Sequence, residues 1–455
     1  MHRCFLILGV CGLVWGPMVR GADWEALGDG VKDCAEALEG ALAKEGGVTL
    51  PRGVYRLTRT VTIDLEKGGF AALSGDGTAR LVMEGEGPAL HFRGTHDGTA
   101  SPATVKDRVW ERERTPSVTG IEIVGGNEAA DGIEATGTMQ LTLDRVVVRG
   151  CRHAVHLTER NRNVLIANCH FYHNRGIGVF YDNVNLHQSN IVGCHISYNG
   201  GGGVVSRGGN VRNLHIGTCD IEGNHAEEGE ATANVLIDCT GGSTGEVAIT
   251  GCTIQHSRNA PDSANIRVLG RGFDEGVGKR IGVAETMEGH VTITGNVMSD
   301  VQVNLHLVGA RGVTVAGNTL WQGMMQDVLV EDCRSVVMTG NSMDRNPRYV
   351  VNETKDTERN GVVFRNCEGC IFADNAVSGV RGQEAAVDFV GCRRTQVRGN
   401  TVLDSPGVLL RIKDCRRCLI SDNLLDAGKE EAKGLEVLGG TDNQMGSNWV
   451  PPKDR

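Results

Sequence analysis

A short motif that recurs along the chain constrains the fold more than any other feature of this sequence. The motif is a run of alternating, mostly β-branched residues, followed two or three positions later by Asn or Cys. Successive copies lie 22 to 25 residues apart, with three longer steps that we interpret as loop insertions. The motif ends at Cys169, Cys194, Cys219, Cys252, Asn296, Asn318, Asn341, Asn375, Asn400 and Asn423.

Each repeat also contains a second strand-like segment, such as residues 303–307 or 328–330, in which apolar and polar residues alternate. Alternation over a few residues between Gly, Asn and Asp predicts short strands, because a helix would repeat its apolar residues every 3.6 positions. Three short strands per repeat would stack into three parallel sheets, so we predict an all-β solenoid. An aromatic content of only 4% fits a core of many small layers.

The beginning of the chain has the composition of an export signal. Arg3 precedes an apolar run from Cys4 to Gly16, which is too short to cross a bilayer. We therefore expect a signal peptide over residues 1–21, a secreted chain and no membrane span. The net charge of −10 disfavours a nucleic-acid partner, because the chain has no overall positive field to attract phosphates.

Three segments near the N-terminus follow one another in a characteristic order. Residues 29–33 precede a helix-like stretch, which we expect over residues 33–42, and a Gly-rich segment at 46–55. This order resembles the opening motif of the pectate lyase superfamily. The resemblance implies a right-handed parallel β-helix over residues 22–440, with an N-terminal cap at 29–57 that includes a short helix, and a tail at 441–455. It implies no single activity, because the superfamily includes lyases, hydrolases, epimerases and non-catalytic binders.

The catalytic motifs of better-known β-helix families are missing. Arg411-Ile412-Lys413 matches one short polygalacturonase motif, but its companion motifs are absent. Neither an acidic calcium constellation nor the Lys/Arg pair of pectate and alginate lyases lies at a matching position. We therefore expect no cofactor, and calcium stays open without a motif to support it.

The cysteines are expected to be buried free thiols. Stacked cysteines in adjacent coils would have parallel Cβ vectors, which hold the Cβ atoms too far apart for a disulfide. Disulfides remain the alternative for an exported chain. Two Cys-x-x-Cys pairs, at Cys367 and at Cys415, would lie two coils or about 10 Å apart, which excludes one shared zinc ion.

Loop insertions indicate where a binding surface would lie. They fall at residues 224–233, 240–246, 256–264, 270–289 and 344–359. Because loops on both sides of a flat outer sheet form a trough, we expect a site for a linear polysaccharide there.

Alternation predicts which side chains face this trough. If residues such as Val235 and Leu305 point inward, Arg207, Asp238, Arg267 and His306 point outward, and we take these four as the candidate catalytic residues. A cation beside a uronate and a His that removes the α-proton would suit β-elimination. Asp238 paired with a loop Glu would suit hydrolysis. A non-catalytic carbohydrate-binding or surface-structural β-helix protein is the alternative to both reactions. The expected substrate-binding residues from the loops are Glu227, Glu228, Asp274 and Lys279.

Two further groups of residues have a structural and a functional interpretation. His170, His173, His195 and His215 are either polar surface residues or, in part, acid–base catalysts. Arg393 and Arg416 belong to a predicted column of Arg residues, which is either neutralised by neighbours such as Glu368 or, with Arg394 and Arg417, binds anionic groups of a glycan.

Overall fold

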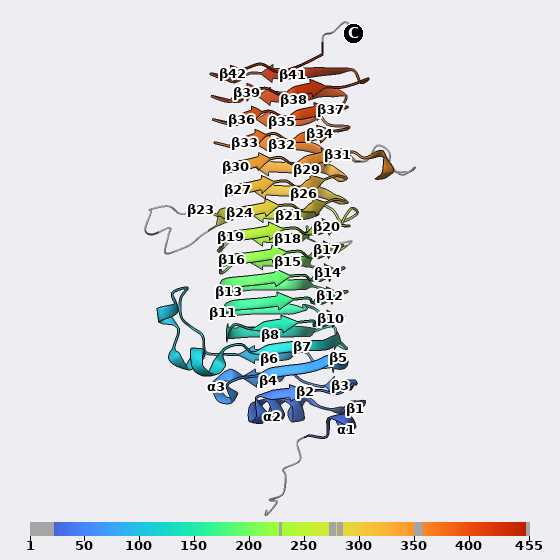
Figure 1. Ribbon diagram of the computed structural model, residues 1–455, viewed down its shortest axis with the longest axis vertical. Helices are drawn as coiled ribbons and strands as arrows, with labels where there is room; N and C mark the ends of the chain where they lie inside the picture. The colour runs from blue at the N-terminus through green and yellow to red at the C-terminus, as the bar shows by residue number, and fades with distance from the viewer. Residues whose placement is uncertain (1–21, 227–229, 273–278, 280–284, 350–357, 452–455) are drawn as a thin grey trace, which may run out of the picture.

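The computed structural model describes residues 22–226, 230–272, 279, 285–349 and 358–451. Its strands, apart from the antiparallel pair β22 (Arg271–Gly272) and β23 (Thr286–Met287), join into one parallel sheet that winds into stacked coils (Figure 1). Each coil crosses three faces, which we call sheet 1, sheet 2 and sheet 3 in the order in which the chain visits them. The predicted three-strand coil is therefore confirmed.

The strand pairings assign every strand to one or two of these faces. Sheet 1 comprises β4 (Val61–Asp64), β6 (Gly87–Arg93), β8 (Ala130–Met139), the first parts of β11 (Val155–Ala167) and β13 (Ile177–Val192), β15 (Gly202–Arg207), β18 (Ala233–Asp238), β21 (Ala264–Leu269), β26 (Val301–Val308), β29 (Gly323–Glu331), β32 (Gly361–Arg365), β35 (Val387–Val390), β38 (Gly407–Lys413) and β41 (Ala432–Leu438).

Sheet 2 comprises β2 (Gly47–Thr49), the first parts of β5 (Ala72–Met83) and β7 (Ser117–Gly125), β9 (Thr142–Asp144), the second parts of β11 and β13, β16 (Asn210–Gly217), β19 (Ser243–Thr250), β24 (Gly289–Thr294), β27 (Arg311–Ala316), β30 (Arg334–Thr339), β33 (Ile371–Ala373), β36 (Gln396–Arg398), β39 (Leu419–Ser421) and β42 (Gln444–Met445).

Sheet 3 comprises β1 (Asp29–Asp33), β3 (Gly53–Leu57), the second parts of β5 and β7, β10 (Val147–Arg149), β12 (His170–Tyr172), β14 (His195–Ser197), β17 (Asp220–Glu222), β20 (Thr253–Gln255), β25 (Val297–Met298), β28 (Thr319–Leu320), β31 (Ser342–Asp344), β34 (Ala376–Ser378), β37 (Thr401–Leu403) and β40 (Leu424–Asp426).

Helices are confined to the N-terminal end and to the loops. Helix α2 (Ala35–Glu45) closes the first coil and buries Ala35, Leu38 and Leu42 (Figure 1). It begins two residues later than predicted and ends at Gly46, whose φ of 72° stops the helix in the left-handed region. The other helical segments are short: α1 (Trp24–Leu27), α3 (Leu65–Gly68), η1 (Pro102–Thr104), η2 (Val109–Glu113) and η3 (Pro347–Tyr349). None of the described helices is long and apolar enough to span a membrane.

The Asn and Cys residues of the repeat form a buried stack at the corner between sheets 2 and 3. The amide Nδ2 of Asn341 donates to Oδ1 of Asn375 over 2.9 Å and to the carbonyl of Val315 over 3.1 Å. Its own Oδ1 accepts from Nδ2 of Asn318 over 2.9 Å. Each side-chain amide thus bonds a backbone carbonyl of one coil and the side chain of the next. These hydrogen bonds satisfy the polar groups of a buried turn that water does not reach.

A second ladder, which the repeat pattern did not reveal, fills the corner between sheets 3 and 1. Each Asn donates its Nδ2 to Oδ1 of the next member over 2.7 to 2.9 Å. Asp327 accepts the last of these bonds and is fully buried, and burial raises its pKa to about 7. The members in order are Asn174, Asn199, Asn224, Asn234, Asn265, Asn304 and Asp327.

The described cysteines are all free and buried, as predicted. Burial raises the pKa of Cys151 to about 12, which keeps its thiol protonated and unreactive at neutral pH. Most of the others donate their Sγ–H to backbone carbonyls, as Cys169 does to Ala167 over 3.1 Å. They therefore act as small core residues with one weak hydrogen bond.

The last coil extends further than predicted. Residues 441–455 were expected to form a tail, but β42 pairs with β39 and Trp449 forms a bridge with Leu424. The coil pattern thus continues to residue 449. This coil leaves Val437, Met445 and Trp449 more than 40% exposed.

The Asn ladder generates a stability prediction. Replacing Asn341 by Ala leaves buried backbone carbonyls and two neighbouring amides without their partners. We expect the free energy of unfolding to fall by about 3 kcal/mol, which equilibrium denaturation would measure.

The matched control is Asn341→Cys, because Cys252 occupies the equivalent place in an earlier coil. A thiol retains a weak donor and fills part of the space, so this variant should lose clearly less stability than Asn341→Ala. Equal losses for both variants would contradict the role given to the side-chain hydrogen bonds.

Candidate functional site

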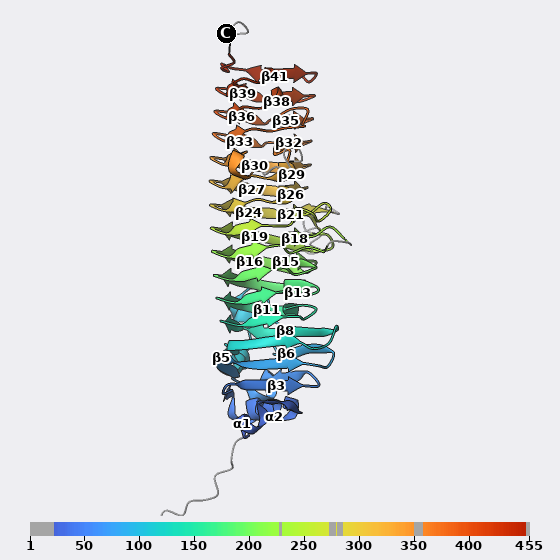
Figure 2. The ribbon, with the colours of Figure 1, turned by 90° about the vertical axis from the view of Figure 1, so that its right-hand side faces the viewer.

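Loops rise on both sides of sheet 1 along the middle of the rod. At the border with sheet 2 the chain leaves the coils over residues 94–116 and again at the antiparallel pair β22 and β23 (Figure 1). At the border with sheet 3 the longer connections precede β18, β21 and β32. Figure 2 shows loops beside β18 and β21 that project beyond the otherwise even outline of the rod. Loops therefore flank sheet 1 on both sides, and we call its outer face between them the trough. Residues 94–116 add a flanking segment that the sequence did not indicate.

The floor of the trough consists of two outward-facing columns, where a column is a set of residues that pair with one another in successive coils. The first column contains His91, Glu134, His156, Phe180, Val205, Leu236, Arg267 and His306. The second contains Thr136, Thr158, Asp182, Arg207, Asp238, Leu269, Val308 and Glu331.

The structure brings two of the predicted catalytic residues together in the second column. Nε of Arg207 lies 3.4 Å from Oδ2 of Asp238, and Oδ1 of Asp238 accepts the backbone N–H of Thr240 over 2.9 Å. The side chain of Asp238 is 14% exposed and that of Arg207 is 48% exposed. Arg207 thus stands at the open surface, while Asp238 is held from two sides.

The other two predicted catalytic residues meet in the first column, one coil further on. Nε of Arg267 donates to Nδ1 of His306 over 3.0 Å, and Nε2 of His306 lies 3.3 Å from Oε2 of Glu331. Burial and the adjacent Arg267 lower the pKa of His306. His306 is therefore neutral, with both ring nitrogens already in hydrogen bonds. Arg267 is anchored in turn by the carbonyl and carboxylate of Asp262.

Residues that sequence reasoning did not single out complete the floor at its N-terminal side. Nε2 of His156 bonds Oδ2 of Asp182 over 3.0 Å, and Glu134 lies between His156 and His91 at 3.9 Å and 3.5 Å. Asp182 precedes Arg207 by one coil of 25 residues and pairs with it. Counting back one repeat length from Arg207 would therefore have identified Asp182 from the sequence.

An apolar patch separates the two polar groups of the first column. Phe180, Val205 and Leu236 pack outside the β-helix core, each less than 10% exposed. The ring of His156 stacks on Phe180 with centroids 5.3 Å apart and planes within 7°. The apolar patch is thus a small buried cluster, and polar groups lie before, beside and after it.

The remaining predictions for the trough have mixed outcomes. Glu227, Glu228 and Asp274 lie outside the described residues, so their roles stay predictions. Lys279 is described and exposed. Arg411 faces outward as expected. Its guanidinium group makes a bidentate contact with the carboxylate of Asp388, from Nε to Oδ1 over 2.9 Å and from Nη2 to Oδ2 over 2.6 Å.

The predicted Arg column exists at the turn between sheets 1 and 2. Backbone bridges place Arg334, Glu368, Arg393 and Arg416 in successive coils. Glu368 pairs with Arg334 at 2.6 Å, with Arg393 at 3.5 Å and with Arg394. Glu368 therefore neutralises the beginning of the column. Towards the C-terminus Arg393, Arg394, Arg416 and Arg417 surround a hollow of about 400 Å³, and the ion pairs of the described residues leave Arg416 without an acidic partner.

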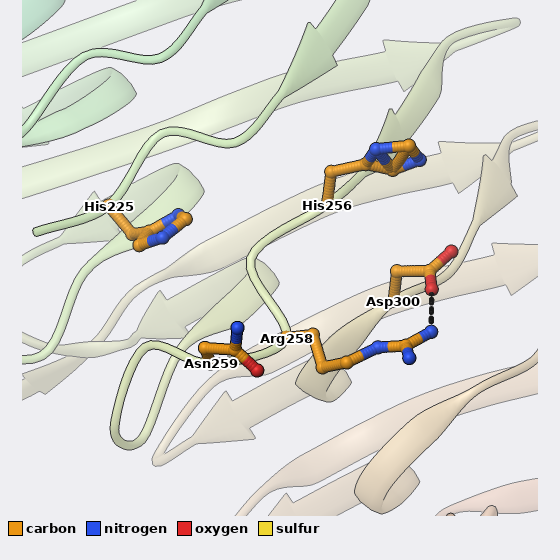
Figure 3. A pocket seen from close by; sticks show the side chains of 5 residues that line it. All are labelled: His225, His256, Arg258, Asn259 and Asp300. Carbon is orange, nitrogen blue, oxygen red and sulfur yellow. Dashed lines mark hydrogen bonds and ion pairs between the residues drawn. The ribbon is translucent and has the colours of Figure 1, made fainter. Parts of the chain in front are cut away.

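A separate hollow of about 260 Å³ lies at the corner between sheets 3 and 1. Figure 3 shows His225 and His256 on its two sides and the ion pair between Arg258 and Asp300 at its base. His225 and His256 were not singled out by their sequence positions. The hollow is polar, and its residues come from three successive coils.

The comparisons with known proteins concern the fold. The family described as "Right handed beta helix region" matches residues 115–254. The chain is a right-handed parallel β-helix. This confirms the predicted fold class, and no curated protein sequence matches the chain.

Solved structures similar to the chain share little sequence with it. The tailspike protein of E. coli bacteriophage HK620 in complex with a pentasaccharide is 11% identical, with a TM-score of 0.50 over 91% of this chain and 77% of that chain. A variant of this tailspike is 12% identical, with a TM-score of 0.52 over the same shares. The A-module of the mannuronan C-5 epimerase AlgE6 from Azotobacter vinelandii is 13% identical, with a TM-score of 0.44 over 94% and 99% of the two chains.

The buried histidines beside the trough predict a loss of stability in acid. Burial lowers the pKa of His153 to about 4, against about 6.5 in an unfolded chain. Below pH 6.5 the unfolded chain takes up a proton that the folded chain accepts only near pH 4, so stability falls over this range. We expect the melting temperature of His153→Gln to fall less steeply than that of the parent between pH 6.5 and 4.

The control is His215→Gln, at an exposed position on sheet 2. Its pH profile should follow the parent. If the melting temperature of His153→Gln falls as steeply between pH 6.5 and 4 as that of the parent, the neutral His153 ring does not account for the loss of stability in acid.

The Arg hollow predicts binding of polyanions. Replacing Arg393, Arg394, Arg416 and Arg417 by Gln should weaken retention on a sulfated-glycan column and flatten its dependence on salt, because screened ion pairs are lost.

The control removes the same charge elsewhere on the surface. If the column retains the first variant like the parent, or if the control loses as much retention, the Arg residues form only a neutralised surface stripe and do not bind polyanions specifically. The control positions are Arg52, Arg112, Arg145 and Arg398, all exposed and outside the trough columns.

Proposed function

We propose that the protein binds a polysaccharide along the trough on sheet 1 and hydrolyses it there. The observation that carries the proposal is the row of Asp182, Arg207 and Asp238, which runs along three successive coils between loop walls. Sugar rings carry hydroxyl groups around their edges, and carboxylates and guanidinium groups can bond these, so such a row suits a linear glycan. The tailspike with the same fold that was solved with a pentasaccharide supports this substrate class.

Asp182 and Asp238 supply the two carboxyl groups for hydrolysis. They occupy one column on either side of Arg207, so two coil spacings, about 9.6 Å in all, separate their backbones. Inverting glycoside hydrolases hold their two carboxyl groups about 6.5 to 9.5 Å apart, which leaves room for the attacking water. The backbone spacing of Asp182 and Asp238 is just above this range, and a slight lean of the two side chains toward each other would bring their carboxyl groups within it. Arg207 between them contacts the sugar.

Arg267 and His306 position the glycan beyond the cleavage point. His306 has no free nitrogen to remove a proton, because Arg267 and Glu331 occupy both. This favours hydrolysis over β-elimination with His306 as the base. The guanidinium groups of Arg207 and Arg267 favour a glycan with carboxylates, in keeping with the resemblance of residues 29–55 to the pectate lyase superfamily. A polysaccharide substrate is in keeping with the signal-like residues 1–21 and a secreted protein.

The test is incubation of the full chain with a panel of acidic and neutral polysaccharides. We expect new reducing ends without the absorbance of unsaturated uronates. Asp182→Asn and Asp238→Asn should each lower the rate by about a hundredfold or more, with nearly unchanged thermal melting. His306→Ala should weaken substrate binding and lower the rate less.

The control is Asp144→Asn, because Asp144 is an outward-facing carboxylate at the same kind of position on sheet 2. Its rate should equal that of the parent. Unsaturated products would overturn hydrolysis in favour of β-elimination. Measurable binding without any product would leave a carbohydrate-binding protein, and absence of both would refute the proposal.

A further inference from the structure

The outer face of sheet 3 carries a second convergent group of side chains, distinct from the trough. His195 in β14 and Asp220 in β17 are paired in register on adjacent coils, and Glu222 faces the same way two residues further on. Nε2 of His195 lies 3.4 Å from Oδ2 of Asp220 and 3.6 Å from Oε1 of Glu222. All three ligand atoms lie within 4.8 Å of one another.

These distances fit the coordination sphere of a metal ion. Ligands about 2.1 Å from a tetrahedral Zn²⁺ lie about 3.4 Å from one another. Within the part of the chain that the structure describes, this is the one set of three His, Cys, Asp or Glu side chains that converges in this way. A small closing movement of Glu222 would bring all three onto one ion.

The nitrogen at the centre of the group has no other role. Nε2 of His195 is buried and makes no hydrogen bond to the described residues. Buried polar atoms are nearly always satisfied, so an unsatisfied one directed at two carboxylates points to a missing partner.

Neighbouring side chains hold the carboxylate as the outer shell of a metal site does. The hydroxyl of Tyr198 donates to Oε1 of Glu222 over 3.0 Å, and Nε2 of Gln255 donates to Oε2 over 3.3 Å. Such bonds orient a ligating carboxylate. Nδ1 of His256 lies 3.9 Å from Oε2 of Glu222, and the ring is 51% exposed at the rim of the hollow in Figure 3.

We propose that His195, Asp220 and Glu222 bind a divalent first-row transition metal ion, with His256 close by on the other side of Glu222. An imidazole nitrogen among carboxylates suits Zn²⁺ or Mn²⁺, whereas Ca²⁺ prefers six to eight oxygen ligands. The ligands come from two successive coils, so the ion joins these coils on the outer face of sheet 3. This site was not expected from the sequence, which predicted no metal.

The experiment is calorimetric titration of the chelator-treated, dialysed full chain with Zn²⁺, and separately with Ca²⁺. We expect one Zn²⁺ per chain and much weaker binding of Ca²⁺. His195→Ala and Asp220→Asn should weaken Zn²⁺ binding at least tenfold, and His256→Ala should weaken it less. Bound Co²⁺ should show visible absorption that disappears in His195→Ala.

The control is His170→Ala, because His170 precedes His195 in the same column with ring centroids 5.8 Å apart but is not a ligand. It should bind Zn²⁺ like the parent, and thermal melting should confirm that every variant is folded. Absence of Zn²⁺ binding, an affinity unchanged in His195→Ala, or equal affinity for Ca²⁺ would overturn the proposal.

Discussion

The hydrogen bonds between parallel strands of successive coils are the constraint on which the rest of this structure depends. Because these bonds hold the coils in register, each side chain lies directly above its counterpart one coil earlier. In sheet 2 the inward column contains Ile166, Ile191, Ile216, Ile249 and Ile293. Each position must accept a neighbour of its own kind, so the sequence repeats with the length of a coil.

The same register has a different effect on the outside. On the outer surface, packing does not require the side chains of one column to be alike. The register still aligns them, and it places Asp182, Arg207 and Asp238 in one row. Loops that leave the coils at the borders of sheet 1 limit access to this row from both sides. The fold thus produces an elongated surface whose chemistry changes in steps of one coil.

Much of the fold could be predicted from the sequence because the register imposes a repeat. The Asn and Cys stack, the buried thiols and the inward residues such as Val235 and Leu305 followed from spacing alone. Spacing alone did not reveal which outward-facing residues lie in the same column. Arg207 and Asp238 lie in one column and Arg267 and His306 in another, because inserted loops change the spacing between strands and hide which residues pair. The ladder beyond Asn224 was hidden for the same reason, since insertions lie between its later members, whereas Asn174, Asn199 and Asn224 keep the 25-residue spacing.

That ladder also has a direction. Every amide from Asn174 onward donates toward the C-terminal end of the rod, so the dipoles of its side chains are aligned head to tail and polarise one another. The donor end of the row meets the carboxyl group of Asp327, which can accept the final bond without passing on another hydrogen. The interior of this β-helix is therefore electrically asymmetric along its axis, although its sheets have little net dipole of their own.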